Sequence, residues 1–397
     1  KFLPVTPEIL KGCHYKGGFD TVSIYLRNYP DSHFFAGKGL ILGGSHSPSP
    51  LNRNAHCGDL SAVLLQNLNP LVNLIRVPDK KIILMDEWES KIKAIVESTW
   101  KADVNSLSGV PSWMLVLIKA VLQKAGSEYL TDVWPNMEVF FHGGISFEPY
   151  RDQYKALIPS NRMHYMETYN ASEGFFGLQD DPAEHSLLLM IDYGVFYEFI
   201  PINEVGREHP TVLPLEAVEV GKNYAMVITT SGGLWRYQIG DTIRFTSLYP
   251  HKFVISGRTK NFINAFGEEL MVDNADKAIS SVCRQTGAKV KEYTAAPLFM
   301  LDKAKGRHQW MIEFEKMPPS LDDFASLLDK ALQQLNSDYE AKRYKEISLQ
   351  PLEIQVAREG TFYEWLRRKG KLGGQHKIPR LSNDRTFIEE LEKIYNL

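Results

Sequence analysis

The sequence has few of the features that are typical of secreted proteins, membrane-spanning proteins or proteins with a structural zinc site. It contains only 3 cysteines in 397 residues, namely Cys13, Cys57 and Cys283, and no two of them have the spacing of a zinc site. A small odd number of scattered thiols is typical of the reducing cytosol. No apolar run approaches the roughly 20 residues of a membrane span, and no basic stretch followed by an apolar one resembles a secretion signal. We therefore expect a cytoplasmic globular protein.

The sequence also lacks an excess of either charge. Its 45 Lys and Arg against 48 Asp and Glu leave a formal net charge of −3. No basic stripe interleaves with the aromatic residues, so the sequence does not indicate a nucleic-acid or anionic-membrane partner. The histidines show no i, i+4 pair around an acid, which argues against a zinc hydrolase. The apolar content of 44% is that of an ordinary globular protein, so an enzyme or a binding protein is expected.

Strand-like and helix-like stretches alternate along the first part of the chain. Short apolar runs predict strands, and apolar residues at helical spacing predict helices. The strands are expected at residues 1–5, 82–85 and 138–141, and the helices at residues 89–96 and 113–122. This alternation predicts an α/β architecture, with a large N-terminal domain of mixed sheets flanked by helices.

The pattern changes twice further along. In residues 186–199 and 224–245, β-branched and aromatic residues broken by glycine predict hairpins or a small β-barrel-like part. After Gly257, strands and helices alternate again and indicate a smaller α+β unit. We therefore divide the chain into a large domain of residues 1–256 and a small, mobile C-terminal domain of residues 257–397.

The expected elements of the C-terminal domain include two capped helices. Asp273 is predicted to cap a helix that runs to about residue 287, and Ser320 a second helix with a leucine-rich face. Strands are expected at residues 293–301, 309–314 and 352–356, and further helices at residues 362–368 and 387–395.

Two segments of the large domain suit contact with a nucleotide. Gly143 and Gly144 follow an apolar run, and paired glycines let a flat group approach the backbone, although a tight turn is the commoner explanation. From Tyr169 to Gly174 the sequence is Tyr-Asn-Ala-Ser-Glu-Gly. Such a segment can hold Mg²⁺ through a carboxylate and phosphate through a hydroxyl, or it is simply a solvated polar loop.

Two later segments carry charged side chains next to glycine. Residues 234–241 predict a strand that ends at Gly240-Asp241, where an acid can accept both hydroxyls of a ribose; a hairpin turn is the alternative. In the glycine-rich loop of residues 370–380, Lys377 and Arg380 are basic. A lysine on a mobile loop can stabilise negative charge in phosphoryl or acyl transfer, but a basic surface loop is the commoner outcome.

Taken in order, these segments resemble the Gretchen Hagen family of acyl acid amido synthetases (auxin-responsive promoter proteins) of the adenylate-forming superfamily. Residues 169–174 are similar to the second ATP motif of that family, and residues 237–241 to its third. Residues 256–260 resemble the superfamily hinge, and residues 375–380 the C-terminal lysine segment. The family's first motif, a Ser/Thr/Gly-rich phosphate loop, is absent. We therefore expect this chain to be a fragment that lacks the N-terminal part.

The resemblance implies an ATP-dependent ligase. Such an enzyme activates a carboxylic acid with Mg-ATP, releases pyrophosphate, and transfers the acyl group to an amine such as an amino acid, releasing AMP. Lys377 and Glu173 are implied as catalytic residues, Glu173 as the Mg²⁺ ligand, and Asp241 as the ribose acceptor. The implied ATP-binding residues are Gly143, Gly144, Tyr169, Ser172, Glu173, Asp241, Arg258, Lys260 and Lys377.

The implied partners are therefore a small carboxylic acid and an amine, with no nucleic acid and no membrane, and the enzyme is expected to be a monomer. Two alternatives stay open. One is a thioester ligase that uses coenzyme A, and the other is a non-catalytic nucleotide-binding relative. The sequence does not identify the acid or the amine.

Overall fold

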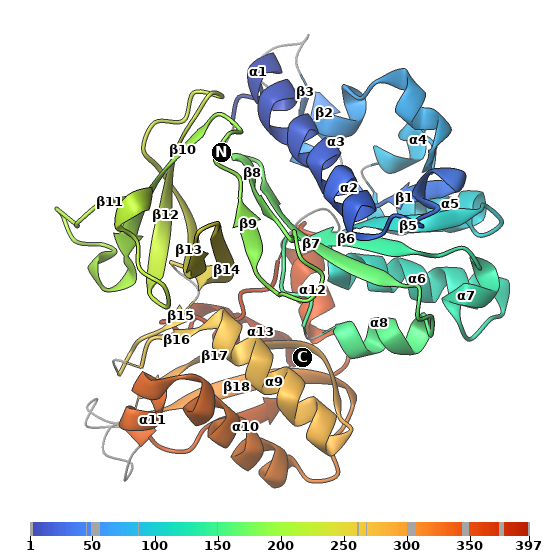
Figure 1. The fold of residues 1–397 in the computed structure, drawn as a ribbon. Helices are drawn as coiled ribbons and strands as arrows, with labels where there is room; N and C mark the ends of the chain where they lie inside the picture. The colour runs from blue at the N-terminus through green and yellow to red at the C-terminus, as the bar shows by residue number, and fades with distance from the viewer. Residues whose placement is uncertain are drawn as a thin grey trace.

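A long mixed sheet forms the framework of the computed structural model (Figure 1). The structure describes residues 3–44, 46–48, 56–85, 87–148, 150–259, 262–266, 268–299, 306–343, 349–372 and 377–395. Within this part of the chain the largest sheet has twelve strands. In spatial order they are β11 (Leu213–Pro214), β10 (Val195–Pro201), β12 (Asn223–Thr230), β13 (Tyr237–Leu248), β14 (His251–Arg258), β9 (Leu187–Leu189), β8 (Gly174–Leu178), β7 (His164–Ala171), β6 (Val139–Gly143), β5 (Val104–Gly109), β1 (Lys38–Ile41) and β4 (Arg76–Val77).

The sheet changes character at β7. Strands β4, β1, β5, β6 and β7 pair in parallel, whereas every pairing from β7 through β8 to β11 is antiparallel. Parallel neighbours need helical crossovers, and antiparallel ones need only hairpins. The α/β pattern of the first part of the sequence and the glycine-broken strands that follow it therefore belong to one continuous sheet.

Helices cover both faces of the parallel part. Val139 of β6 packs in one cluster with Tyr25, and its neighbour Phe140 packs in another with Tyr154, because successive side chains of a strand point to opposite faces. The helices are α1 (Pro7–Ile9), the π-helix η1 (Leu10–Tyr15), α2 (Lys16–Asn28), α3 (Leu60–Gln66), α4 (Lys80–Ile83), α5 (Trp88–Thr99), α6 (Pro111–Ala125), α7 (Leu130–Val133) and α8 (Arg151–Leu157). Short 3₁₀ turns are η2 (Phe34–Ala36), η3 (Pro70–Leu74), η4 (Ile202–Glu204) and η5 (Leu215–Ala217), and the minor strands are β2 (His46–Pro48) and β3 (His56–Gly58).

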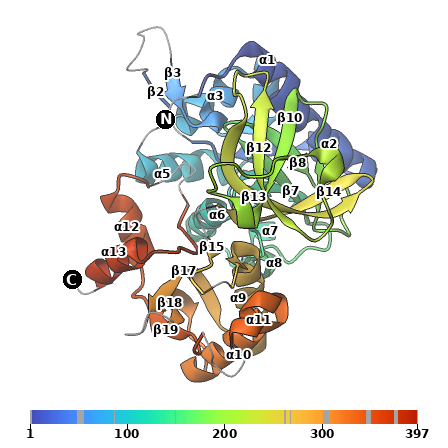
Figure 2. The same cartoon turned by 90° about the vertical axis from the view of Figure 1, so that its left-hand side faces the viewer.

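The C-terminal residues build a smaller unit beside one end of the sheet (Figure 2). Strands β17 (Lys289–Phe299), β18 (Gly306–Lys316) and β19 (Glu353–Val356) form a sheet of their own. The remaining elements are β15 (Phe262–Ile263), β16 (Leu270–Met271), α9 (Val272–Thr286), α10 (Leu321–Leu335), α11 (Ser337–Arg343), α12 (Thr361–Arg368) and α13 (Thr386–Tyr395). One core of this unit contains only residues from Ile263 onward, whereas another joins α12 and α13 to Trp88 and Trp113 of the large sheet region.

Most predicted elements are confirmed. The strand at residues 138–141 is β6, and the helices at residues 89–96 and 113–122 are α5 and α6. The C-terminal strands and helices agree with β17, β18, β19, α10, α12 and α13, and Ser320 caps α10 by accepting from Asp323 N at 3.2 Å. The helix that begins near Asp273 is α9.

Two predicted strands are wrong. Residues 3–5 form no strand, because Thr6 caps a helix that starts at Pro7, where the missing N–H of proline is not needed. Ile82 and Ile83 are the last residues of helix α4, in which both backbone N–H groups donate to Asp79 O, and residues 84 and 85 follow the helix without forming a strand. Only Ile83 of that apolar run is fully buried. A helical turn with one side chain facing the core is therefore sufficient for this segment.

Two further expectations need correction. Asp273 does not cap α9: the N-cap is Met271, whose N–H donates to Asn274 Oδ1 at 3.1 Å, and Asp273 pairs with Arg244 instead. The structure does not confirm a barrel-like part either, because strands β9 to β14, as far as the chain is described, continue the twelve-stranded sheet. In the same described residues, no helix combines the length and the apolar character that crossing a membrane requires.

Candidate active site

A large cavity of about 1200 Å³ lies between the end of the main sheet and the C-terminal unit. The tip of the β7–β8 hairpin, the start of β13, the end of β14, helices α6 and α9, and the segment after residue 376 all line it. Most of the predicted site residues meet at its wall: Gly144, Tyr169, Ser172, Glu173, Asp241, Arg258 and Lys377. Gly143 lies in β6 just before the lining, and Lys260 falls outside the described residues.

The β7–β8 hairpin carries Ser172 and Glu173 at its tip. Ala171 and Gly174 are paired across the two strands, so Ser172 and Glu173 form the two-residue turn between them. A hairpin tip places both side chains beyond the paired part of the strands, and both line the cavity. The predicted carboxylate and hydroxyl therefore lie next to one another at the cavity wall, as oxygen ligands of a cation would have to.

Asp241 lies within a strand and not at the end of one, which corrects the prediction. Strand β13 begins at Tyr237, and the paired residues shift where β13 passes Met226 of β12. Gly240 has a φ of 89°, a left-handed conformation that glycine adopts without strain, so β13 bulges there. The bulge turns Asp241 toward the cavity, where Thr259 N secures it by donating to Gly240 O at 2.8 Å.

Asp241 has a defined partner on each side. Tyr169 Oη donates to Asp241 Oδ2 at 2.5 Å, and Arg258 Nε pairs with Asp241 Oδ1 at 2.8 Å. Burial raises the pKa of Tyr169 well above its ordinary value, and the negative charge of Asp241 raises it further. The phenol is therefore a hydrogen-bond donor at any physiological pH. One phenol, one guanidinium and one carboxylate from three different strands form a fixed polar group.

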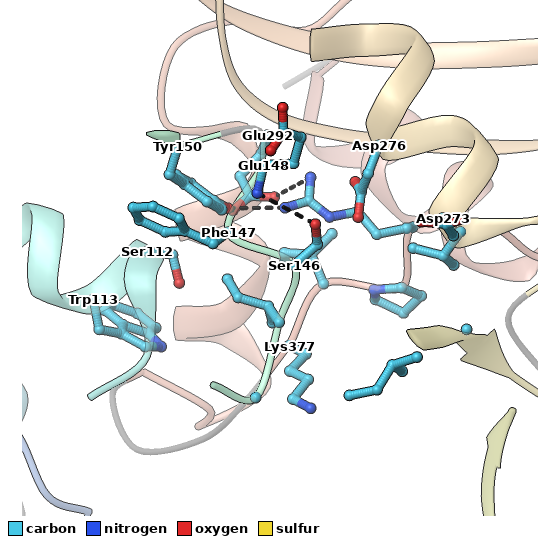
Figure 3. A pocket seen from close by; sticks show the side chains of 18 of the residues that line it. Ser112, Trp113, Ser146, Phe147, Glu148, Tyr150, Asp273, Asp276, Glu292 and Lys377 are labelled. Atoms are coloured by element: carbon cyan, nitrogen blue, oxygen red, sulfur yellow. Dashed lines mark hydrogen bonds and ion pairs between the residues drawn. The ribbon is translucent and has the colours of Figure 1, made fainter. Parts of the chain in front are cut away.

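Lys377 enters the cavity from the C-terminal unit, as Figure 3 shows. A Cβ added to Gly144 would lie 3.9 Å from Lys377 Cε, so the lysine side chain passes directly over that glycine. The side chain is accessible to water in the cavity, but the surrounding protein desolvates it and lowers its pKa. Asp241 raises this pKa, Arg258 lowers it, and Glu173 raises it, so Lys377 lies within electrostatic reach of all three.

Backbone pairing holds the segment that carries Lys377 in place. Ala295 N of β17 donates to Arg380 O at 2.9 Å, and Ser382 N donates to Ala295 O at 3.0 Å. Thr294 Oγ1 also donates to Pro379 O at 2.7 Å. The expected loop is therefore attached to β17 by an isolated parallel bridge between Ala295 and Leu381, and Lys377 lies just before this attachment point. The glycines at residues 373 and 374 lie outside the described residues.

Glycine is required at positions 143 and 144 for two different structural reasons. A Cβ at Gly143 would lie 2.3 Å from Thr168 O of the neighbouring strand, so the packing of β6 against β7 alone requires glycine there. Gly144 has a φ of 84°, and a Cβ there would also approach Val110 Cγ2 at 3.4 Å. Of the pair, only Gly144 lines the cavity.

Sequence reasoning missed a buried network beside the site (Figure 3). Arg380 Nη1 pairs with Glu292 Oε2 at 2.9 Å, and Arg380 Nη2 donates to Tyr150 Oη at 2.8 Å. The guanidinium carbon lies 4.5 Å from the centre of the Tyr293 ring, and Tyr293 Oη donates to Asp276 Oδ1 at 2.5 Å. The basic character of Arg380 was visible in the sequence. Nothing in the pattern of β17 or α9 distinguishes Glu292 or Asp276 from a solvated acid.

Glu167 is a second residue that the sequence did not single out. It precedes Tyr169 by two positions in β7, lines the same cavity, and has a pKa raised to about 7 because burial disfavours the charged carboxylate. Arg151 lowers this pKa, whereas Asp273 and Glu148 raise it. The period-two spacing from Tyr169 is the one signal that could have pointed to Glu167.

The donors at the hairpin tip fit a small hard cation. In the described part of the chain, no group of three or more His, Cys, Asp or Glu side chains could hold a metal by itself. Mg²⁺ does not need such a group, because it is commonly held by one or two carboxylates together with substrate phosphates and water. Glu173, with the Ser172 hydroxyl beside it, is the donor set of that kind in this cavity.

Comparison with known proteins agrees with this geometry. Three models of one family match the chain in order: the GH3 family N-terminal domain at residues 1–163, the central domain at residues 188–258 and the C-terminal domain at residues 273–386. Together these three matches cover most of the 397 residues.

Similar curated proteins are named as synthetases. The chain is 30% identical over 302 residues to indole-3-acetic acid-amido synthetase GH3.8 of Oryza sativa, covering 70% of this chain and 49% of that protein. It is 29% identical over 287 residues to indole-3-acetic acid-amido synthetase GH3.3 of Arabidopsis thaliana, covering 66% and 46%. The chain thus spans about half the length of these relatives.

Solved structures share the fold. A GH3.15 acyl acid amido synthetase matches with a TM-score of 0.76 at 19% identity, over 100% of this chain and 80% of that one. A 2-hydroxyisobutyryl-CoA ligase, an adenylate-forming relative in fold, matches with a TM-score of 0.55 at 13% identity, over 95% and 73%. As the order of its motifs predicts, the chain belongs to the GH3 family.

Proposed function

We propose that the protein carrying this chain is an ATP-dependent acyl acid amido synthetase. It activates a carboxylic acid as an acyl-adenylate with release of pyrophosphate, and an amine then displaces AMP to form an amide. The observation that carries this proposal is the convergence of Glu173, Asp241 and Lys377 on one cavity in a chain of the GH3 family. The amido synthetase names of its relatives support the same reaction class.

The polar group around Asp241 is the ribose end of the site. Asp241 accepts the ribose hydroxyls, Arg258 keeps the carboxylate oriented from one side, and Tyr169 does so from the other. Gly144 leaves the backbone open beside this group, so a planar base can lie against it, and Gly143 sets the close packing of β6 on β7 below. Lys260 is proposed to act with Arg258 at the hinge.

The hairpin tip is the phosphate end. Glu173 holds Mg²⁺ together with phosphate oxygens, and Ser172 donates to phosphate. When bound, Mg²⁺ neutralises phosphate charge and supports the departure of pyrophosphate. Lys377 neutralises the charge that develops between the attacking carboxylate and the α-phosphate, because an ammonium in a partly desolvated cavity interacts strongly with anions.

The reaction needs two arrangements of the chain. We propose that residues 257–397 form the mobile domain and that residues 1–256 form the large one, with rotation near Arg258 where β14 ends. In the arrangement described here Lys377 lies in the cavity, which suits adenylation. The free thiols Cys13, Cys57 and Cys283 favour a reducing, cytoplasmic setting.

The test is pyrophosphate release by the protein with ATP, Mg²⁺ and a panel of aryl and alkyl carboxylic acids. Release that depends on one class of acid supports adenylation and identifies that class. Product analysis with amino acids or with coenzyme A then separates an amide ligase from a thioester ligase. A folded protein that binds no ATP would contradict the proposal and favour a non-catalytic relative.

A further inference from the structure

Two consecutive residues of the π-helix η1 contact the hairpin that carries Ser172 and Glu173. Cys13 and His14 are both buried, and both reach the end of this hairpin just below its tip. Figures 1 and 2 show the N-terminal helices α1 and α2, with η1 between them, beside β8. A π-helical turn carries one residue more than an α-helical turn, and such insertions are frequent at functional sites.

The hairpin is irregular where these two residues meet it. Tyr169 pairs with Gly177 and Asn170 with Phe175, so Phe176 is an extra residue and β8 bulges there. Phe175 N–H donates to Cys13 Sγ at 3.1 Å, and the Cys13 thiol lies 3.9 Å from Phe175 O. Cys13 thus satisfies the backbone of the bulged strand, in place of the partner that a regular ladder would supply.

His14 holds the opposite strand. Its Nδ1 lies 3.0 Å from Asn170 Oδ1, and because that oxygen can only accept, His14 donates through Nδ1–H. Asn170 and Phe175 are paired across the hairpin. Cys13 and His14 therefore contact the two strands of the hairpin at the same pair of residues. Beyond this pair the hairpin consists of Ala171, Ser172, Glu173 and Gly174, and the first three of these line the cavity together with Asn170.

Packing alone does not account for a histidine at position 14. The side chain is 3% exposed, and its Nε2 has no hydrogen-bond partner among the described residues. Burial lowers the pKa of His14 to about 4, so the ring is neutral at pH 7. A buried polar atom without a partner costs about 1–3 kcal/mol, which a leucine of similar volume would avoid. The gain from His14 must therefore lie in its contact with Asn170.

We propose that His14, with Cys13 beside it, is a positioning residue that fixes the hairpin tip so that Glu173 meets the Mg²⁺ of Mg-ATP. This inference rests on the proposed function. Residues that orient a metal ligand through hydrogen bonds, without binding the metal themselves, commonly change metal affinity by about 10- to 100-fold. The contact is made from the side of the hairpin that α1 and α2 cover, by residues outside every ATP motif of the chain.

The experiment measures ATP binding by calorimetry, once with excess Mg²⁺ and once with EDTA, and needs no turnover. In wild type, Mg²⁺ is expected to tighten ATP binding. In His14→Leu we expect ATP binding with Mg²⁺ to weaken by about tenfold, binding with EDTA to stay unchanged, and the melting temperature to stay equal or rise. His14→Asn should restore most of the loss, because its amide N–H can donate to Asn170 Oδ1. Asn170→Ala should also weaken ATP binding with Mg²⁺, but because Asn170 itself lines the cavity, this variant does not enter the comparison with EDTA.

His164→Asn is the matched control. His164 lies at the far end of the same strand β7, where its Nδ1 lies 3.0 Å from Tyr25 Oη and its ring stacks on Tyr29 at 3.6 Å. This variant should lower stability without changing the effect of Mg²⁺. Equal Mg²⁺ dependence in wild type and His14→Leu would overturn the inference, as would an equal loss in His164→Asn. A wild type that binds no ATP would overturn the proposed function as well, which distinguishes the two failures.

Discussion

Removal of Arg380 should destabilise the C-terminal unit far more than removal of an ordinary surface arginine. Arg380 and Glu292 form an ion pair at 2.9 Å with side chains that are 13% and 18% exposed, and Tyr150 adds a hydrogen bond. Breaking such a buried pair by removing one partner costs about 3–5 kcal/mol, because the other charge is left without compensation. Arg380→Met keeps an apolar side chain in place but removes the cation of the pair, so that Glu292 retains the hydrogen bond from Tyr150 Oη at 3.2 Å and no counter-charge from Arg380.

The melting temperature measures this loss. At about 2–4 °C per kcal/mol for a unit of this size, Arg380→Met should lower the transition of the C-terminal unit by about 10 °C. Adding Glu292→Gln removes the unpaired charge and should recover at least half of the loss. Calorimetry and circular dichroism of the single and double variants provide the measurement.

A second ion pair provides the matched control. Lys119 Nζ lies 2.9 Å from Glu315 Oε2, with side chains that are 46% and 34% exposed, and it also joins the two parts of the chain. Lys119→Met should cost less than about 1 kcal/mol, as exposed pairs do. Arg380→Met costing no more stability than Lys119→Met would show that burial does not make the Arg380 pair essential.

Three further predictions concern the cavity. Asp241→Ala should weaken ATP binding by about 10- to 100-fold, because the ribose loses hydrogen bonds to a charged acceptor, and unchanged calorimetric affinity would exclude that role. Lys377→Ala should slow pyrophosphate release by about 10²- to 10³-fold without changing the melting temperature; a wild-type rate would contradict its place near the α-phosphate. Burial raises the pKa of Glu167 to about 7, above the ordinary glutamate value of 4.5. Its folded state therefore binds a proton that the unfolded state has lost, and stability falls as pH rises from about 4.5 to 7. Glu167→Gln should flatten this fall in thermal melts, and an unchanged pH profile would show that the carboxyl is not desolvated.

Local chemistry explains what could be predicted from the sequence. Helices α5, α6 and α10 follow from apolar spacing and a serine cap. The order of the motifs was sufficient to indicate the family, because each motif is defined by a few neighbouring residues. Short apolar runs were ambiguous: the apolar run at residues 82–85 fits a strand as well as the end of helix α4, where its first two residues lie.

Relations between distant residues could not be predicted in the same way. Tyr169 and Asp241 are 72 positions apart and share a hydrogen bond, and Arg380 reaches Tyr150 across 230 positions. The bulge that aims Asp241 into the cavity depends on how β13 passes β12, which no pattern within 237–241 reveals. Whether Glu292 and Asp276 were solvated or buried also depended on packing from other elements.

The sequence by itself determined the chemical groups, the α/β class and the family, because these depend on residue types and on short-range spacing. Only the tertiary structure decided that Glu173, Asp241 and Lys377 line one cavity, that protein around Lys377 lowers its pKa, and that Cys13 and His14 support the hairpin from behind. The physical reason is the distance along the chain between the residues that interact. Hydrogen bonding within a turn is set by neighbours, whereas burial and electrostatic coupling are set by whatever the fold brings within a few ångströms.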